Sequence, residues 1–422
     1  GGKPTLEGGI QEADIIAALR LYITREKFSF PATHQGLGYN NLIYISLMLA
    51  SMSFRASQRR GQNAAIFPML LIEEPEAHLH PALQYKLLSH IVSRVEDEPN
   101  DSRQVFVTTH STHVTSAVKL NSIIGLSLNC DGTIGVSYPG KLFPQTEKGQ
   151  VSRGYVERYL DATKSTMLFA KGVLLVEGIA EQLIVPALAH ALGMPFDHHH
   201  VAIVRVDGLT FKHFLYLFGA GSAEGMEEFA LNCPVACLVD ADPTRKEKGV
   251  KNARWKSCFP FELGHDDSSY DYRDLSGVVA NLNSLKKNRV NIGIFHGEKT
   301  LEYDLAMWNY KCQEFVTTVI KHADEIRQLA IKPMALSGKL KEMLNDDEYE
   351  ALEKITSENK QKQHRFAAAY LRCAEKCKGE HAFALEQLLR LEKNASIVKC
   401  PSYIQQAIKW VTKFVPAKER TS

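Results

Sequence analysis

Four acidic residues near the ends of two predicted strands have the types and spacing that metal binding needs. In VLLVEGIAE, Glu177 ends an apolar strand and Glu181 follows four residues later, as a helix begins. In ACLVDAD, Asp240 and Asp242 end a second apolar strand and point the same way from extended backbone. Solvated strand ends paired with lysines are the simpler alternative. Because adjacent carboxylates repel and oxygen ligands favour Mg²⁺ or Mn²⁺, we predict a site for one of these ions.

Two further acidic motifs follow the same pattern less clearly. In KTLEYDLA (299–306), Glu302 and Asp304 stand at the start of a predicted helix, as metal ligands or as helix-capping residues. Asp207 ends the predicted strand 201–208. It joins the site or makes a turn with Gly208, and the turn is favoured.

A run of cations follows Asp242, with Trp255 among them. A charge run is usually a solvated face, but its place beside a predicted metal site favours contacts to a DNA phosphate backbone, without sequence readout. It lies in residues 243–289, where the strand–helix pattern stops and we expect an insertion or long loop. The predicted DNA-binding residues are Arg245, Lys246, Lys248, Lys251, Arg254 and Lys256.

Nearer the N-terminus, a second set of residues predicts part of an ATP site. MLLIEEPEAHLHP (69–81) is an apolar strand that ends in Glu73 and Glu74, placed to face Mg²⁺ and the attacking water respectively. A second apolar strand, 103–111, presents His110, which can bind a phosphate oxygen or align water. Solvated glutamates and a structural histidine are the alternatives.

A glycine-rich turn, HQGLGYNN (34–41), precedes a predicted helix whose N-terminal N–H groups can meet a phosphate. Its candidate residues are Gly36, Gly38 and Asn40. No GxxxxGK[ST] motif, the loop that cradles β- and γ-phosphates, occurs in the chain. We expect that loop to lie N-terminal of residue 1, and we expect that without it the chain does not bind ATP in the usual way.

These motifs, in this order, resemble a known family. The glycine turn, Glu73-Glu74, the stretch Glu76–His80 and His110 resemble the signature loop, Walker B, D-loop and H-loop of ABC and SMC-like ATPases. EEPEAHLHP resembles the ATPases attached to OLD (overcoming lysogenization defect) nucleases. Glu177-Gly178, followed by Asp240-Ala241-Asp242, resembles the TOPRIM domain of topoisomerases, primases and OLD nucleases.

The resemblance implies a two-metal DNA endonuclease or nickase, regulated by an ATPase, with a role in antiphage defence or DNA processing. One Mg²⁺ or Mn²⁺ ion activates water and the other stabilises the leaving 3′ oxygen. The implied ligands are Glu177, Glu181, Asp240, Asp242, Glu302 and Asp304. The family also uses a lysine from the helical region, for which KQKQHRFAAAY (360–370) offers Lys362, with Lys360 and Arg365 as alternatives.

The expected fold class is α/β: a partial ABC-type ATPase layer, then a Rossmann-like parallel TOPRIM sheet and a helical region. The expected domains are residues 1–164, which include dimerisation helices, 165–320 and 321–422. Residues 10–25 are predicted as a helix. The expected partners are DNA, a second copy or higher homo-oligomer, and a defence-system protein, and ATP with Mg²⁺ only together with the absent Walker A loop.

Composition limits the alternatives. Lys+Arg number 50 and Asp+Glu 48, so a nucleic-acid surface must be local rather than global. No apolar run reaches the ~18–20 residues of a membrane span, and we expect a cytoplasmic protein. The main alternative is an ATP-gated DNA-binding scaffold or sensor that does not cleave. A topoisomerase would need a marked nucleophilic tyrosine and a primase further elements, and we find neither.

Overall fold

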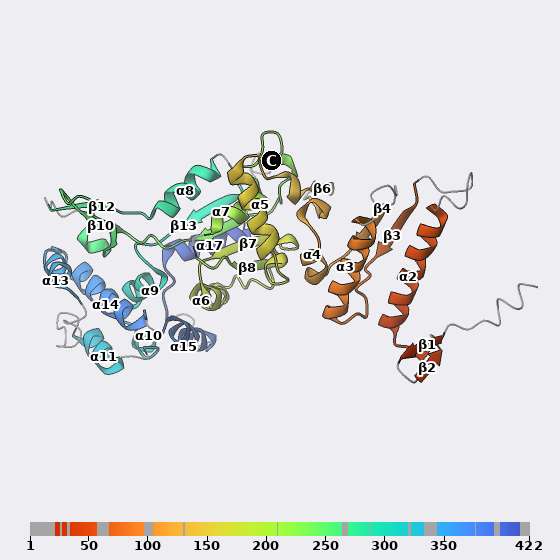
Figure 1. Cartoon of the computed structure of the whole chain (residues 1–422). Helices are drawn as coiled ribbons and strands as arrows, with labels where there is room; N and C mark the ends of the chain where they lie inside the picture. The colour runs from red at the N-terminus through yellow and green to blue at the C-terminus, as the bar shows by residue number, and fades with distance from the viewer. Residues whose placement is uncertain are drawn as a thin grey trace, which may run out of the picture. The chain divides into compact units, whose positions relative to one another are not determined.

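The computed structural model describes residues 22–25, 28–31, 34–56, 67–96, 104–129, 131–208, 210–263, 269–287, 289–319, 322–332, 344–375, 377–391 and 397–413. The chain forms two compact units, residues 1–118 and 119–422. Figure 1 labels their helices and strands. The mixed α/β architecture with parallel sheets confirms the predicted fold class. Among the described residues, no helix is both long and apolar enough to cross a membrane.

The first unit is built on two parallel strands. Leu70 and Ile72 of one strand, and Val105 and Val107 of the other, alternate along the backbone and share a core with helix residues such as Leu88. The unit contains β1 (Tyr22–Arg25), β2 (Phe28–Pro31), α2 (Leu37–Ala56), β3 (Met69–Glu73), α3 (Pro81–Glu96), β4 (Gln104–Thr108) and α4 (Thr112–Ser116).

The helix predicted over residues 10–25 is wrong at its end. Residues 22–25 form β1, which pairs antiparallel with β2 in the register Tyr22↔Pro31, and residues 10–21 lie outside the described residues. Tyr22, Ile23 and Thr24 are aromatic or β-branched, so pairing with a second strand outweighs a weak helical periodicity.

The second unit is centred on a four-stranded parallel sheet in the order β13-β9-β7-β8. The strands predicted to end in Glu177, Asp207 and Asp240 are present, and a fourth strand follows the insertion. They are β7 (Gly172–Val176), β8 (Val201–Arg205), β9 (Val235–Leu238) and β13 (Ile292–Phe295). Residues 172–176 are all buried, as expected for a central parallel strand with both faces covered.

Helices cover both faces of this sheet. Val173 and Leu175 belong to one core, and Leu174 and Val176 belong to the other, because side chains alternate along a strand. Figure 1 shows α5, α7 and α8 on one side of the sheet and α6 and α15 on the other. The bounds are α5 (Glu147–Tyr159), α6 (Ile179–Ala191), α7 (Phe211–Leu215), α8 (Gly277–Lys286) and α15 (Lys378–Arg390).

The unit boundaries differ from the predicted domains. Val156 and Leu160, predicted to belong to the ATPase part, share a core with Leu175 of the sheet. Ile404 and Ile408 of the C-terminal helices pack into the opposite core. The remaining helices are α9 (Leu301–Asn309), α10 (Gln313–Val316), α11 (Ala323–Ile331), α13 (Asp346–Glu353), α14 (Glu358–Ala374) and α17 (Ser402–Lys413).

The predicted insertion, residues 243–289, contains its own small sheet and ends in α8. Three antiparallel strands run in the order β11-β10-β12, with β10 (Thr244–Glu247), β11 (Lys256–Ser257) and β12 (Tyr270–Arg273). A further antiparallel pair, β5 (Gly125–Leu128) and β6 (Ile134–Ser137), corresponds to the weaker strands of the sequence.

Candidate metal centre

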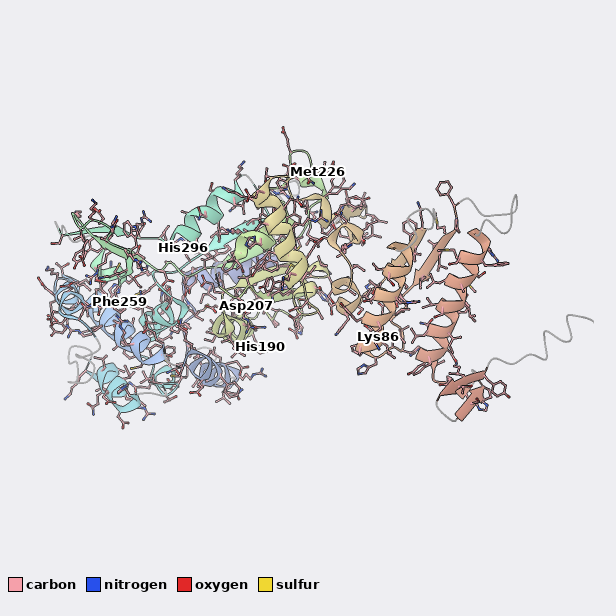
Figure 2. All side chains as sticks on the ribbon, viewed as in Figure 1. Lys86, His190, Asp207, Met226, Phe259 and His296 are labelled. Atoms are coloured by element: carbon pink, nitrogen blue, oxygen red, sulfur yellow. The ribbon has the colours of Figure 1, made fainter. Side chains whose placement is uncertain are left out.

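The strand order places two acidic motifs side by side. From β7 the chain passes to β8 on one side, and later to β9 on the other, so the order reverses between β7 and β9. Ligands of open parallel sheets bind at the carboxyl ends of strands at such a reversal. Val176 pairs with Leu238, so Glu177 and Asp240 both emerge at this point. In Figure 2, Asp207 and His296 mark the carboxyl ends of the two outer strands, β8 and β13.

Backbone hydrogen bonds hold two of the carboxylates in place. The N–H of Asp240 donates to Oε1 of Glu177 at 3.1 Å, which joins the ends of β9 and β7. The N–H of Gly178 donates to Oε2 of Glu181 at 3.1 Å, so Glu181 also caps the start of α6. Both side chains are therefore oriented by backbone N–H groups just beyond the ends of β9 and β7.

Burial and mutual repulsion perturb these acids strongly. Burial, with added repulsion from Glu181 and Asp242, raises the pKa of Glu177 to about 7. Burial raises the pKa of Asp240 well above its ordinary value, and the charges of Glu181, Glu177 and Glu302 add to that effect. Burial and the charge of Glu302 also raise the pKa of Glu181. Burial likewise raises the pKa of Asp242.

The charges of Glu177, Glu181, Asp240, Asp242 and Glu302 influence one another, and we refer to these five residues as the acidic cluster. An all-oxygen donor set whose members repel one another is suited to a hard divalent cation such as Mg²⁺ or Mn²⁺. Among the described residues, no group of three His, Cys, Asp or Glu side chains is already arranged to hold a metal ion.

Glu302 and Asp304 differ in their surroundings although both stand in the first turn of α9. Thr300 is the N-cap residue of this helix and accepts from the N–H of Tyr303, so neither acid is needed as the N-cap. Both Asp304 oxygens accept from the N–H of Glu298, at 3.1 and 3.2 Å. Burial raises the pKa of Asp304 to about 7, and its two hydrogen bonds hold the loop before α9.

Among the described residues, Lys378 forms an ion pair with a carboxylate of the acidic cluster. The Nζ of Lys378, at the first position of α15, lies 3.6 Å from Oε1 of Glu302. Although burial opposes it, attraction from Glu302, Asp240 and Glu181 raises the pKa of Lys378. Its side chain is 45 % exposed.

The predicted lysine has a different partner. Lys362 pairs with Glu358 one turn earlier on α14, and the alternative Arg365 pairs with Glu353. No local sequence pattern identifies Lys378, because α15 reaches the cluster only by packing against other elements. This packing is close: a Cβ added at Gly379, the next residue, would lie 3.9 Å from the side chain of Ile179 in α6.

Asp207 forms a turn with Gly208, which is the alternative that the sequence favours. Its φ of 57° lies in the left-handed region, and Gly208 follows with φ 96°. Its oxygens pair with Arg205 at 2.6 Å and with Lys164 at 3.5 Å. Asp207 therefore has cationic partners of its own at the end of β8.

The predicted DNA-binding residues divide into paired and unpaired cations. Arg245 is committed to structure: its guanidinium lies 2.9 Å from Glu262 and 3.4 Å from Asp347, and it covers the ring of Tyr270 at 4.7 Å. Lys248 pairs with Asp271 and Lys256 with Glu247. Within the described part of the insertion, no ion pair joins Lys246, Lys251 or Arg254 to an acid.

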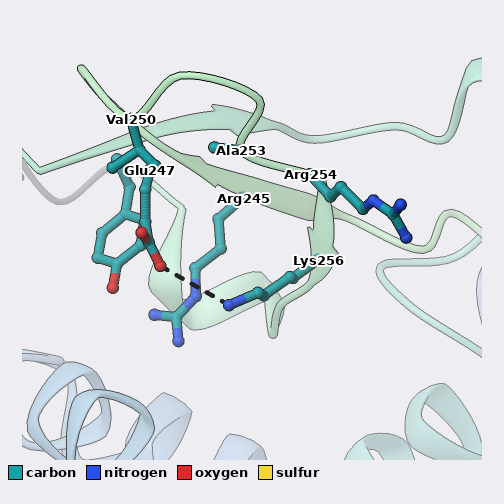
Figure 3. A pocket seen from close by; sticks show the side chains of 7 residues that line it. Arg245, Glu247, Val250, Ala253, Arg254 and Lys256 are labelled. Carbon is teal, nitrogen blue, oxygen red and sulfur yellow. Dashed lines mark ion pairs between the residues drawn. The ribbon is translucent and has the colours of Figure 1, made fainter.

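A small hollow of about 70 Å³ opens beside this sheet. Figure 3 shows Arg245, Arg254 and Lys256 around it, with the Lys256–Glu247 pair across it. Because Arg245 is neutralised by buried and exposed carboxylates, the positive charge that remains here comes mainly from the outer cations.

The candidate ATP-site residues meet within the first unit. Nε2 of His110 lies 3.6 Å from Oε1 of Glu74, with both side chains exposed, and the N–H of Glu74 donates to the carbonyl of Thr108 at 3.0 Å. Glu73 is the last residue of β3. Glu76 accepts from the Thr109 hydroxyl at 2.6 Å and from the His110 N–H at 3.0 Å, which joins the loops after β3 and β4.

The glycine turn packs against the first of these loops. A Cβ at Gly38 would lie 2.5 Å from the carbonyl oxygen of His78, whereas one at Gly36 would meet nothing within 4 Å. The N–H of Asn40 donates to the carbonyl of Gly36 at 3.1 Å, and its side-chain amide donates to the carbonyl of Gln35 at 3.3 Å. The turn and the loop that follows the carboxylate strand are thus neighbours.

Comparison with known proteins supports both parts. Residues 5–115 match a family model described as AAA ATPase domain. Residues 168–242 match one described as overcoming lysogenization defect protein-like, TOPRIM domain.

Two curated relatives are similar to the chain. "Endonuclease GajA" of Bacillus cereus (strain HuB5-5) is 21% identical over 94% of this chain and 56% of its own length. "OLD nuclease" of Thermus scotoductus (strain ATCC 700910 / SA-01) is 25% identical over 48% of this chain and 36% of its own length. The chain thus spans about half or less of these relatives.

Among solved structures, the C-terminal region of the Xanthomonas campestris pv. campestris OLD protein aligns with 59% of this chain and 95% of its own. The identity is 21% and the TM-score 0.33. The two family models and the two curated relatives agree with the motifs quoted from the sequence. The chain therefore joins an AAA ATPase segment to an OLD-like TOPRIM domain, and its predicted resemblance to the OLD family is confirmed.

Proposed function

We propose that this chain acts as a metal-dependent DNA endonuclease or nickase of the OLD type. The observation that carries the proposal is the acidic cluster at the carboxyl ends of β7 and β9, where five carboxylates from three separate segments converge. Such a concentration of buried like charge is costly for the fold alone, and perturbed acids of this kind mark functional sites. The names of the curated relatives, an endonuclease and an OLD nuclease, support the same activity.

The five acids of the cluster would hold two divalent cations, Mg²⁺ or Mn²⁺. When bound, these cations supply an activated water and stabilise the oxygen that leaves the phosphate. Asp304, also predicted as a ligand, would hold the loop that leads into Glu302. The cluster itself would position the ions, because its members stand at the ends of β7 and β9 or in the first turns of α6 and α9.

We propose Lys378 as the lysine that assists catalysis. Its ammonium group neighbours Glu302 and is partly exposed, so it can turn from that carboxylate toward a phosphate. There it would offset the negative charge that develops during hydrolysis. Among the predicted DNA-binding residues we favour Lys246, Lys251 and Arg254 for phosphate contacts, since none of them has to leave a carboxylate partner within the described part of the insertion.

The first unit would contribute regulation. Glu73, Glu74 and His110 with the turn at Gly36–Asn40 would complete an ATP site together with a phosphate-binding loop of the GxxxxGK[ST] type. We propose that ATP with Mg²⁺ at such a site controls the nuclease, within a homodimer or higher oligomer. The biological role we propose is antiphage defence or DNA processing, with a defence-system protein as partner.

The proposal is tested on supercoiled plasmid with Mg²⁺ or Mn²⁺. Glu177→Gln and Asp240→Asn keep the shape of each side chain and remove its charge, and we expect each to slow cleavage by about 100-fold or more. The matched control is Asp207→Asn, a carboxylate at the end of neighbouring β8 that is paired with Arg205 and Lys164. Unchanged cleavage in both cluster variants would contradict the site.

The alternative is a DNA-binding scaffold or sensor that does not cleave. Retained plasmid binding without cleavage by the wild-type chain, in either metal and also when a phosphate-binding loop is supplied, would favour it. The convergence of the acidic cluster argues for cleavage, because DNA binding alone needs no buried carboxylates.

A further inference from the structure

Lys299 is a buried cation in the loop between β13 and α9. The residue is 5% exposed, and its Nζ donates to Oγ of Ser257 at 2.9 Å and to the carbonyl of Cys258 at 2.8 Å. The ammonium group also lies 5.0 Å from the centre of the Phe259 ring. These three neighbours belong to the insertion, on or directly after β11.

The main chain of Lys299 contacts the acidic cluster directly. Its carbonyl accepts from the N–H of Ala241 at 2.9 Å and from the N–H of Asp242 at 3.3 Å. Asp242 has a φ of 40°, a left-handed conformation that a residue with a side chain adopts at a cost. The two bonds hold the turn after β9 in that conformation.

The ammonium charge of Lys299 acts on the same turn. Burial raises the pKa of Asp242, and the charges of Lys299 and Lys378 act in the opposite direction. These two cations differ in kind: Lys378 is ion-paired with Glu302 and half-exposed, whereas the hydrogen-bond acceptors of Lys299 are a hydroxyl and a carbonyl. Within the described residues, no carboxylate lies within ion-pair distance of Lys299, so its charge is held in place without being neutralised.

We propose that Lys299 is a positioning residue of the acidic cluster: its carbonyl shapes the Asp240–Asp242 turn, and its ammonium group is a fixed counter-charge behind Asp242. This role rests on the proposed metal-dependent function. In the metal-free protein the counter-charge reduces repulsion among the carboxylates. When a divalent cation binds, the same charge repels it, so Lys299 limits how tightly the site holds its metal.

The charge and the anchor can be separated by substitution. Lys299→Gln removes the charge and keeps an N–H donor for Ser257 and Cys258, while Lys299→Met removes both, and the main-chain carbonyl remains in each. Lys171→Met is the control, because Lys171 is exposed and directly precedes β7, at the opposite end of that strand from Glu177.

The experiment measures Mn²⁺ binding by calorimetry, thermal unfolding without metal, and plasmid cleavage against Mn²⁺ concentration. For Lys299→Gln we expect the Mn²⁺ dissociation constant and the half-saturating Mn²⁺ concentration to fall by about fivefold. The metal-free melting temperature should fall as well, while the maximal cleavage rate changes less than the half-saturating concentration. Lys171→Met should match the wild type in every measurement.

Two results would overturn the role of Lys299. If Lys299→Gln binds Mn²⁺ more weakly than the wild type, the residue acts only by supporting the loop. If only Lys299→Met departs from the wild type, the anchor matters and the charge does not. Lys299→Gln decides the question even if Lys299→Met fails to fold.

Failure of the proposed function has a different signature. A wild-type chain that binds Mn²⁺ but does not cleave contradicts the nuclease, while its binding constants still test Lys299. A wild-type chain that binds no Mn²⁺ contradicts both.

Discussion

The main-chain N–H of Asp240 donates to the side chain of Glu177 across 63 residues of sequence, at 3.1 Å. This bond joins the carboxyl ends of two neighbouring parallel strands. It holds two acids close together although their negative charges repel each other. Burial of both raises their pKa values. The unfavourable burial and repulsion of these acids should affect both the stability of the fold and the chemistry of the site.

A divalent cation should stabilise the fold by relieving repulsion within the acidic cluster. We expect Mn²⁺ to raise the melting temperature of the wild type by about 2 °C or more, since a ligand that binds only the folded state stabilises it. Asp240→Asn should raise the metal-free melting temperature and shrink the Mn²⁺ effect. A metal-free variant less stable than the wild type would contradict the repulsion, with Asp207→Asn as the control in the same melting experiments.

Substitutions of the two candidate lysines, Lys378 and Lys362, should affect the cleavage rate differently. Lys378→Met removes the cation beside Glu302, and we expect cleavage to slow by about 100-fold because charge on the phosphate is no longer offset. Lys362→Met removes an exposed pair with Glu358 and should leave cleavage within about twofold of the wild type. Plasmid nicking at saturating Mn²⁺ measures both, and the reverse order would restore Lys362.

Substitutions of the two glycines in the turn before α2 should differ in cost. Gly38→Ala puts a Cβ 2.5 Å from the carbonyl oxygen of His78, and we expect a loss of about 1–3 kcal/mol in the unfolding free energy of the first unit. Gly36→Ala meets no atom within 4 Å and should be nearly neutral. Urea denaturation of the whole chain, with limited proteolysis to follow the first unit, measures the difference, and equal effects would argue against the close packing.

Arg245 and Arg254 should have opposite roles although both belong to the basic run. Arg245→Met leaves the Glu262 carboxylate, whose side chain is 2% exposed, without its arginine partner. We therefore expect a loss of about 3 kcal/mol in the free energy of unfolding. Arg254→Met should leave stability within about 0.5 kcal/mol and weaken DNA binding, with a shallower dependence on salt. Thermal unfolding and fluorescence anisotropy with labelled DNA measure these effects. A stable Arg245→Met chain that binds DNA poorly would reverse the assignment.

His364 should make the fold sensitive to mild acid. Burial, with a smaller effect of Lys360, lowers the pKa of His364 to about 4, and its Nδ1 lies 2.7 Å from the Tyr303 hydroxyl. Between pH 6.5 and 4 the unfolded chain binds a proton here that the folded chain does not, so stability falls as pH falls. From pH 7.5 to 5 the loss is on the order of 1–2 kcal/mol.

The test compares urea unfolding of the wild type and His364→Asn at both pH values. Other acids, such as Glu177 and Asp304, also change stability over this range, so the difference between the two proteins is the informative quantity. The variant should lose less stability than the wild type on acidification. Equal losses would mean that His364 is not buried in its neutral form.

The apolar strands and the acids that end them could be predicted from the sequence. Runs such as GVLLV signal a strand buried on both faces, and the carboxyl ends of parallel strands in one sheet share an edge. These two rules bring Glu177 near Asp240 without any coordinates. The same reasoning correctly predicted the turn at Asp207.

Neighbours from distant helices and loops could not be predicted in this way. Lys378, Lys299 and the partners of Arg245 are set by how α15, the loop before α9 and the insertion pack. The family resemblance suggested Lys362, whose side chain pairs with Glu358 on its own helix. The packing of Val156 and Leu160 against the sheet could not be predicted for a similar reason, because an apolar residue does not reveal which core it joins.

The sequence by itself therefore determined where the strands of the second unit lie along the chain and which acids end them, because local periodicity and residue type report burial and charge. Only the tertiary structure decided which cations face those acids and which are neutralised elsewhere. A charged side chain acts according to the distance and burial of its partners, and for Lys299 and Lys378 those partners lie tens of residues or more away in the chain.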